Sequence, residues 1–327
     1  MTIYDVAKKA GVSIATVSRV INESDLVTEK TRKKVESVMN EIGYRPNIFA
    51  RGLVTDTVKT IGVVSVDIRD SYYSEVVYNI NREMRRMGYG VVITNTEPQK
   101  SDVKRELNFL IDRRVDGIML VGSVFADKEY ASLIKDIAQN VPIAAINAKI
   151  SLENVFCTVC DDAFGTYELM EAIHKKGKNK PIYICDNDSQ STMHKIKGYK
   201  KAMREIFFKR AEVIHCGDSA DTAADVIEQI KLRGCDCAVF SNDMLAAGFV
   251  CRAVQLGINV PDEIGMAGYD NLLFATVTTP PLTTVDSRQD EISRVASRTL
   301  VNVIEGGSGK VQKLNMIKPL PVMRESI

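Results

Sequence analysis

The residues whose spacing points most directly to chemistry lie between positions 13 and 22. In a helix, Ala15, Ser18, Arg19 and Asn22 fall at i, i+3, i+4 and i+7 and share one outward face. An arginine on such a face can donate two parallel hydrogen bonds to a guanine edge in the DNA major groove, and a small alanine can touch a thymine methyl. The pattern predicts a helix that reads DNA, although the periodicity alone fits a plain three-helix bundle with a solvated Arg19 equally well.

The hydroxyl and amide side chains beside this face would have a second role. Thr16, Ser18 and Asn22 can hydrogen-bond to phosphate oxygens, and such contacts fix the register of a helix on the duplex without reading its sequence. The inward positions of the same helix are apolar, namely Val17, Val20 and Ile21.

Three short helices would hold this face in place. Thr2 and Asp5 form a capping-box pattern for the first helix, Gly11 would end it, and Ser13 can cap the second. Thr28 can cap the third helix. The expected buried residues are Val6, Ala7 and Ala10 in the first helix and Val35, Val38, Met39 and Ile42 in the third. Two helices joined by a tight turn that contains glycine predict a helix-turn-helix.

Charge is unevenly distributed along the chain. Residues 1–51 contain nine Lys and Arg and six Asp and Glu, which gives +3, so the remainder of this +1 chain carries about −2. A basic head on a slightly acidic body is compatible with nucleic-acid binding. The length of 327 residues, with 45% hydrophobic and 26% charged residues, predicts a soluble protein of two or three domains.

The run TIYDVAKKAGVSIATVSRVIN closely resembles the DNA-binding signature of the lactose-repressor (LacI/GalR) family of transcription regulators. By position, the resemblance implies that Ile14, Ala15 and Arg19 read bases. It implies that Thr16, Ser18 and Asn22 contact the DNA backbone, and that Tyr4 and Ser13 also touch phosphate. The head would then span residues 1–46.

A hinge is expected at residues 47–57, because Pro46 breaks the third helix and Asn47 can cap a new one. In the family that the chain resembles, this segment becomes helical on the operator and a leucine wedges into the minor groove. The matching residue is Leu53, supported by Ala50. The alternative is a plain linker with Leu53 packed on the body.

From residue 60 onward, buried strands alternate with amphipathic helices in two successive series. This alternation predicts an α/β fold with parallel sheets and two similar lobes. NDMLAAG, GINVPDEIGMAGYDN and PPLTTV resemble the periplasmic-binding-protein type I core of the same family. The implied core spans 58–327, with an N-lobe at about 58–160 and 290–322 and a C-lobe at about 161–289.

Candidate ligand contacts are expected where strands end at the cleft between the lobes. Asn242 and Asp270 follow two such strands and match family ligand-binding positions, although Asn242 could instead cap a helix. Asn147 and Lys195 fall where relatives carry an aspartate and an arginine. An arginine can donate two parallel hydrogen bonds to adjacent oxygens, whereas a lysine presents a single point charge. Lys195 could therefore indicate an anionic effector, an altered sugar or a weakened site. The remaining candidates, Tyr72 and Tyr73, could stack on a sugar ring or pack in a core or dimer interface.

Other classes of function find little support in the sequence. Gly88 to Ile93 and Gly306 to Val311 miss the dinucleotide and phosphate-loop patterns, and no catalytic residues or cofactors are expected. Cys157 and Cys160 lie in a probable strand, where residues three apart point to opposite faces, so no metal site is expected. The chain shows no signal peptide or apolar stretch long enough for a membrane span, which predicts a cytoplasmic, nucleoid-associated protein.

The resemblance therefore implies a homodimeric regulator, in the manner of a repressor, that binds pseudo-palindromic double-stranded operator DNA. A small, sugar-like effector would bind between the lobes and change the DNA affinity. One alternative is a catabolite-control regulator that responds mainly to a phosphorylated carrier protein. Another is a sugar receptor without DNA binding, which the basic head disfavours.

Overall fold

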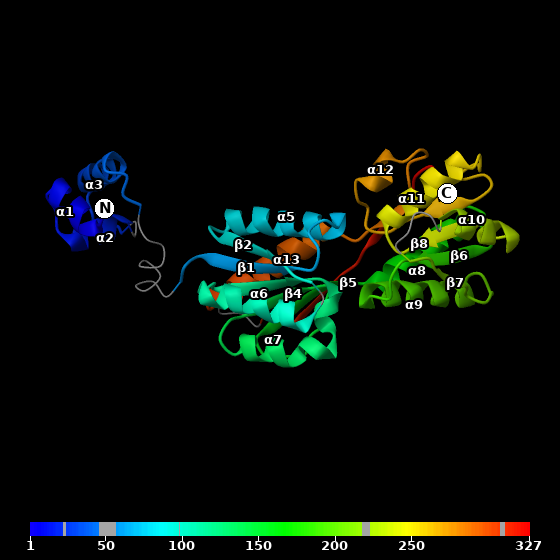
Figure 1. The fold of residues 1–327 in the computed structure, drawn as a ribbon, viewed down its shortest axis with the longest axis horizontal. Coiled ribbons are helices and arrows are strands. Elements are labelled where there is room, and N and C mark those ends of the chain that lie inside the picture. The colour runs from blue at the N-terminus through cyan, green and yellow to red at the C-terminus, as the bar shows by residue number, and fades with distance from the viewer. Residues whose placement is uncertain (22–23, 46–56, 98, 218–222, 308–310) are drawn as a thin grey trace. The chain divides into compact units, whose positions relative to one another are not determined.

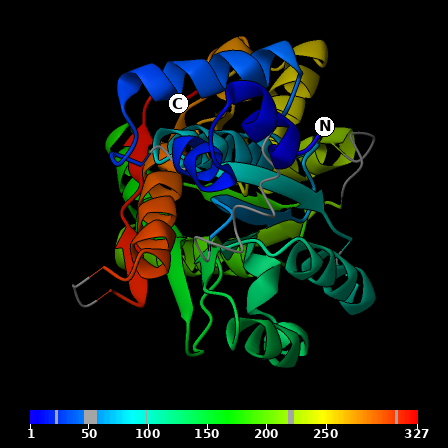
Figure 2. The ribbon, with the colours of Figure 1, turned by 90° about the vertical axis from the view of Figure 1, so that its left-hand side faces the viewer.

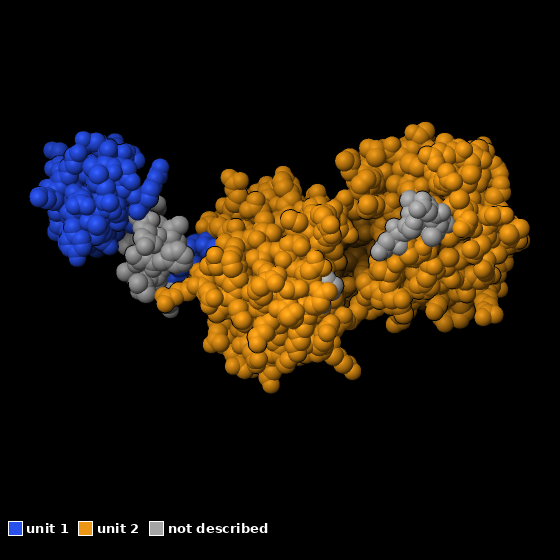
Figure 3. All heavy atoms as spheres, viewed as in Figure 1, with its two compact units in different colours: residues 1–60 blue, residues 61–327 orange. Residues whose placement is uncertain are grey.

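A computed structural model describes residues 1–21, 24–45, 57–97, 99–217, 223–307 and 311–327. The chain divides into two compact units, residues 1–60 and 61–327, which Figure 3 shows in different colours. Among the described residues, no helix is long and apolar enough to cross a lipid bilayer.

The smaller unit contains α1 (Ile3–Ala10), α2 (Ile14–Ile21) and α3 (Glu29–Glu41), the blue helices of Figures 1 and 2. Gly11 ends α1 with φ 61°, a left-handed conformation that favours glycine. The Asp5 carboxylate accepts hydrogen bonds from the Thr2 N–H at 2.8 Å and the Thr2 hydroxyl at 3.0 Å. The predicted helix-turn-helix is confirmed, including the local signals that delimit its first helix.

The core of the smaller unit is formed by small apolar side chains, which are Val6, Ala7, Ala10, Val17, Val20 and Val35. The predicted stripe of α3 is wrong in part, because only Val35 is buried, whereas Val38, Met39 and Ile42 are half-buried at the edge of the cluster. So small a unit buries a limited fraction of its surface, and its outer apolar residues therefore stay partly exposed.

The first lobe of the larger unit is built on a six-stranded sheet in the order β11-β5-β4-β3-β1-β2. Its strands are β1 (Thr60–Ser65), β2 (Gly90–Asn95), β3 (Gly117–Val121), β4 (Ile143–Ile146), β5 (Val155–Cys160) and β11 (Leu314–Ile317). Its helices are α5 (Ser71–Arg86), α6 (Lys100–Asp112), η1 (Ser123–Ala126), η2 (Lys128–Tyr130), α7 (Ala131–Ala138) and α13 (Gln289–Ile304). The pairs β1–β3, β3–β4, β4–β5 and β5–β11 are parallel. One apolar cluster lies beneath α6 and α7, and another lies beneath α5 and α13.

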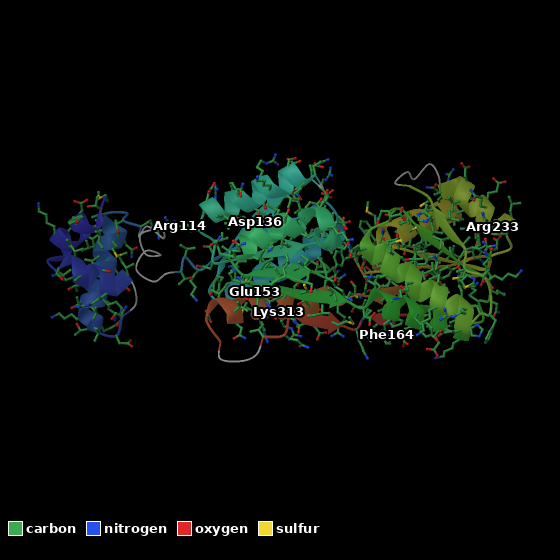
Figure 4. All side chains as sticks on the ribbon, turned by 90° about the horizontal axis from the view of Figure 1, so that it is seen from below. Arg114, Asp136, Glu153, Phe164, Arg233 and Lys313 are labelled. Atoms are coloured by element: carbon green, nitrogen blue, oxygen red, sulfur yellow. The ribbon has the colours of Figure 1, made fainter. Side chains whose placement is uncertain are left out.

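The second lobe is built on a four-stranded parallel sheet in the order β7-β6-β8-β9. Its strands are β6 (Pro181–Cys185), β7 (Val213–His215), β8 (Cys237–Phe240) and β9 (Gly265–Ala267). Its helices are α8 (Asp162–Lys175), α9 (Gln190–Glu205), α10 (Ala223–Leu232), α11 (Asp243–Gln255) and α12 (Phe274–Val277). In Figure 4, Asp136 marks the first lobe, and Phe164 and Arg233 mark the second. The predicted α/β fold with two parallel sheets is confirmed.

Three chain segments connect the two sheets of the larger unit. The first runs from β5 to α8, and the second leads from β10 (Thr284–Asp286) to α13. The third leads from β11 to β12 (Leu320–Val322), which pairs antiparallel with β10. After β12 the chain returns to the second lobe, where the Met266 N–H donates to the Ser326 carbonyl at 2.8 Å. Each lobe is therefore assembled from segments that are distant in the sequence.

Candidate functional site

The outward face of α2 presents the side chains expected to read bases. Ile14, Ala15 and Arg19 are exposed, and the hydrophobic Ile14 side chain is 41% exposed. Within the described part of the chain, the Arg19 guanidinium has no hydrogen bond or ion pair, although the Arg19 carbonyl accepts from the Ser24 N–H at 3.0 Å, so the side chain is free to contact a partner. Tyr4 on α1 is 67% exposed. The smaller unit thus holds an unpaired arginine on a rigid helix, flanked by small or apolar neighbours.

The hydroxyls expected to contact phosphate are partly engaged within the head. Ser13 Oγ accepts a hydrogen bond from the Thr16 N–H at 3.1 Å and lies 2.9 Å from the Thr16 hydroxyl. Ser13 therefore caps α2 as predicted. Thr16 and Ser18 are half-buried beside the exposed face. Asn22, Ala50 and Leu53, three further DNA contacts expected from the sequence, lie outside the described residues.

The second candidate site is a cavity of about 100 Å³ in the larger unit, lined from both lobes. The unit is visibly hollowed between its two halves in Figure 3. All six ligand contacts expected from the sequence line this cavity, and they are Tyr72, Tyr73, Asn147, Lys195, Asn242 and Asp270. Residues expected from strand ends and residues expected from family positions therefore share one cavity, while the ligand-binding role of each residue stays a prediction.

Lys195 is held in the floor of the cavity by α9. Gly198, one turn further along α9, allows close packing against α8, because a Cβ at Gly198 would collide with the Ala163 carbonyl oxygen. The Lys195 side chain is buried, and its Nζ donates to the Ser241 carbonyl at 2.8 Å. The same Nζ lies 3.7 Å from Asp270 Oδ2 and 4.0 Å from the centroid of the Tyr269 ring. Lys195 is thus surrounded by acceptors that the protein itself supplies.

The pKa values of Lys195 and Asp270 depend on each other. Burial alone would lower the pKa of Lys195, but the carboxylates of Asp270 and Asp162 raise it above its ordinary value. Burial raises the pKa of Asp270 to about 6, against the opposing influence of Lys195. Neither group can be removed without leaving a buried charge without its partner.

Asn147 and Asn242 also have structural roles. Asn147 Nδ2 donates to the Tyr72 hydroxyl at 2.5 Å, and Asn147 Oδ1 accepts from the Cys160 N–H at 2.9 Å. Asn242 Oδ1 accepts from the Leu245 N–H at 2.8 Å. Asn242 therefore caps α11, which is the alternative role that the sequence left open. Asn242 Nδ2 still lines the cavity, donating to Asp186 Oδ2 at 3.0 Å. Capping and ligand contact are therefore compatible at this position.

The sequence did not predict several of the residues that line the cavity. They are Asp70, Gly122, Ser123, Asp162, Asn187, Ser189, Ser191, Thr192 and Ser241. Most follow the ends of β1, β3, β6 and β8, so applying the strand-end rule to every strand would have found them. Asp162 follows the end of β5 in the same way and begins α8, and its Oδ2 accepts from the Ser191 hydroxyl at 2.7 Å. Within the described residues, no group of His, Cys, Asp and Glu is arranged to hold a metal ion.

Comparison with known proteins gives a match for each of the two parts of the chain. Residues 2–47 match the model of bacterial regulatory proteins of the lacI family, and residues 58–319 match that of periplasmic binding proteins and the sugar binding domain of the LacI family. The chain is 35% identical to an HTH-type transcriptional regulator of Lachnoclostridium phytofermentans over 312 residues, 94% of each chain. It is 32% identical to the HTH-type transcriptional regulator DegA of Bacillus subtilis, over 99% of this chain and 97% of DegA.

Among solved structures, the chain resembles a lac repressor dimer bound to operator and the anti-inducer ONPF. The TM-score is 0.87 at 25% sequence identity, and the match covers 100% of this chain and 98% of the other. The resemblance inferred from the head and from the core motifs is confirmed over nearly the whole length. The chain belongs to the LacI family of bacterial regulatory proteins, which are helix-turn-helix regulators of transcription and not enzymes.

Proposed function

We propose that this chain is a dimeric repressor whose affinity for operator DNA is set by a small molecule bound between its lobes. One pair of observations carries the proposal. The exposed face of α2 offers an unpaired Arg19, and a separate unit holds a polar cavity lined from two lobes. A ligand that changes the angle between the lobes would change the spacing of the two heads in a dimer and thereby the DNA affinity.

The roles of individual residues follow from this proposal. In the head of residues 1–46, Ile14, Ala15 and Arg19 would contact base edges. Phosphates would be held by Tyr4, Ser13, Thr16, Ser18 and Asn22. Residues 47–57 would form the hinge, with Leu53 as the minor-groove wedge beside Ala50. The core of residues 58–327 would bind the effector through Tyr72, Tyr73, Asn147, Lys195, Asn242 and Asp270.

The DNA half of the proposal is tested with the full chain and an operator selected from a library of random duplexes. We expect one pseudo-palindromic sequence to be enriched, because each head of a two-fold dimer reads one half-site. The affinity, followed by fluorescence anisotropy, should fall steeply with salt because bound lysines and arginines release counterions from the duplex. A salt-independent affinity, or enrichment of no sequence, would overturn the DNA half.

The effector half is tested by thermal denaturation with a panel of sugars, sugar phosphates and nucleobases. A ligand of the cleft should raise the melting temperature and shift the operator affinity in the same titration. A panel that shifts neither quantity, together with a shift caused by a phosphorylated carrier protein, would replace the small-molecule effector with a protein partner.

A further inference from the structure

The cavity between the lobes contains more carboxylates than cations. Asp70, Asp162 and Asp270 line it, and Lys195 is the single lysine or arginine among its described lining residues. Asp162 and Asp270 are buried, whereas Asp70 stands at the exposed rim. A fourth carboxylate, Asp186, lies alongside, where it accepts hydrogen bonds from the Ser241 hydroxyl and the Asn242 amide, each at 3.0 Å. The lining therefore carries an excess of negative charge.

The charge of Lys195 is already used within the protein. Its Nζ donates to the Ser241 carbonyl at 2.8 Å, lies 3.7 Å from Asp270 Oδ2 and stands over the face of the Tyr269 ring. A phosphate or carboxylate entering the cavity would have to compete with Asp270 for this lysine. It would also lie beside Asp162, whose charge has no lysine or arginine of its own among the described lining residues. An anionic ligand therefore meets repulsion from several sides and attraction from one group.

The neighbouring carboxylates act on Asp270 in particular. After burial itself, the negative charges of Asp162 and Asp70 help to raise the pKa of Asp270 to about 6, while Lys195 opposes them. A cation placed among these groups would relieve the repulsion. The remaining lining residues are hydroxyls and amides, including Asn187, Ser189 and Thr192, which suit a ligand with several hydroxyl groups.

We propose that the cleft takes a polyhydroxylated ligand bearing a protonated amine, such as an amino sugar, and discriminates against phosphorylated or carboxylated sugars. This inference rests on the proposed function, because it assumes that the cleft binds the effector. Asp162 and Asp70 are the residues that would give the amine its advantage, Asp162 from the floor and Asp70 from the rim. Lys195 then positions Asp270 instead of marking an anion site.

The test compares matched ligands on the full chain by calorimetric titration at pH 7.5. The probes are glucosamine, galactosamine and mannosamine, the three parent hexoses, glucose 6-phosphate and glucuronate. At least one amine should bind ten-fold or more tightly than its parent hexose, and the two anions should bind more weakly than glucose. Tighter binding of a phosphorylated or carboxylated sugar, or no preference for any amine over its parent, overturns the inference and leaves the proposed effector site standing.

Variants identify the carboxylates responsible. Asp162→Asn keeps the acceptor for the Ser191 hydroxyl and removes the charge, and it should reduce the affinity for the amine by about ten-fold while changing that of the parent hexose much less. Asp70→Asn should act in the same direction with a smaller factor, because Asp70 is exposed. Asp136→Asn on the exposed surface of α7 is the matched control (Figure 4), and it should change neither affinity. Equal losses for amine and hexose in Asp162→Asn would assign a structural role to Asp162 and overturn the inference.

An outcome in which none of the ligands binds separates this inference from the DNA-binding half of the proposed function. If none of the eight probes binds while the operator is still bound with a steep salt dependence, the inference fails together with the small-molecule half of the proposed function. The DNA-binding half then stands on its own measurement.

Discussion

The head and the cleft hold the side chains proposed to bind DNA and effector in opposite ways. On α2, the side chains of Ile14, Ala15 and Arg19 face solvent, and the Arg19 guanidinium makes no hydrogen bond within the described part of the chain. In the cleft, Lys195 and Asp270 pair with each other, and the amides of Asn147 and Asn242 are hydrogen-bonded to neighbours. A buried polar group without a partner is costly, whereas an exposed one is satisfied by water. Binding of DNA by the head, as proposed, would therefore need no internal rearrangement, while binding of a ligand in the cleft would require an exchange of hydrogen-bond partners.

The largest expected effect contrasts the two regions directly. Lys195→Met leaves Asp270 buried without its cation, and removing one partner of a buried pair costs about 3–5 kcal/mol. We expect the larger unit of this variant to unfold at a clearly lower temperature in calorimetry without ligand. Arg19→Ala should stay within about 0.5 kcal/mol of the parent chain, as for a surface substitution. Comparable losses in the two variants would contradict the contrast.

The two regions should also respond oppositely to pH. Burial raises the pKa of Asp243 to about 7, above its ordinary 3.8, so its stabilising contribution is fully present below about pH 4 and is lost as the pH rises to 7. In the head, hydrogen bonds from Thr2 lower the pKa of Asp5 below its ordinary 3.8. The stability that Asp5 adds is therefore present above pH 3.8 and is lost as the pH falls further.

Asp243→Asn isolates the larger of these two responses. The asparagine can accept from the Leu272 N–H and donate to the Thr284 hydroxyl, which now donates to Asp243. Relative to the parent chain, the variant should gain stability between pH 4 and 7 by an amount of up to about 4 kcal/mol, at 1.36 kcal/mol per unit of pKa. Melting temperatures across this pH range measure the difference. If the melting temperatures of variant and parent changed with pH in parallel, Asp243 would be ionised throughout this range and the prediction would be wrong.

Operator affinity should depend on Arg19 with no matching loss of stability. We expect Arg19→Ala to weaken binding by about 1–3 kcal/mol, or roughly five- to more than a hundred-fold, and to relax the preference at one base position of each half-site. Anisotropy at fixed salt measures the change. Arg233→Ala, which removes an exposed ion pair with Glu212 in the larger unit, is the control and should bind operator normally.

Ser13 sharpens the comparison, because it combines an internal hydrogen bond with an expected phosphate contact. Ser13→Ala should lower the stability of the head by about 1 kcal/mol through loss of the α2 cap. Ser18→Ala, at a half-buried position whose hydroxyl has no described partner, should leave stability nearly unchanged while weakening DNA binding. Proteolysis of the head in the native chain would report the first effect, and anisotropy the second. If the head were cleaved at the same rate in both variants, the Ser13 hydroxyl would not stabilise α2 as a cap.

The sequence predicted features of local origin better than features that arise from packing. Gly11 and Ser13 act within a few residues, so the helix-turn-helix could be predicted with its boundaries. Asn242 and Asp270 were found because both follow strands. Asp162 was missed although it follows β5, because a strand end does not by itself show which polar residue becomes buried. Asp162 is buried by packing between α8 and α9, where the Ser191 hydroxyl donates to it. The partial exposure of α3 likewise depends on the size of the core.

The interleaved connections of the larger unit have a consequence for protein synthesis. Residues 1–45 contain everything that the described head needs, so this unit can fold as soon as it leaves the ribosome. The first lobe lacks its edge strand until Leu314–Ile317 has been made, and the second lobe waits for Ser326, whose hydroxyl accepts from the Thr283 N–H at 2.8 Å. Translation thus yields a folded head nearly three hundred residues before a complete cleft. A chain interrupted near residue 300 would keep its DNA-reading helix but lack a finished sensor.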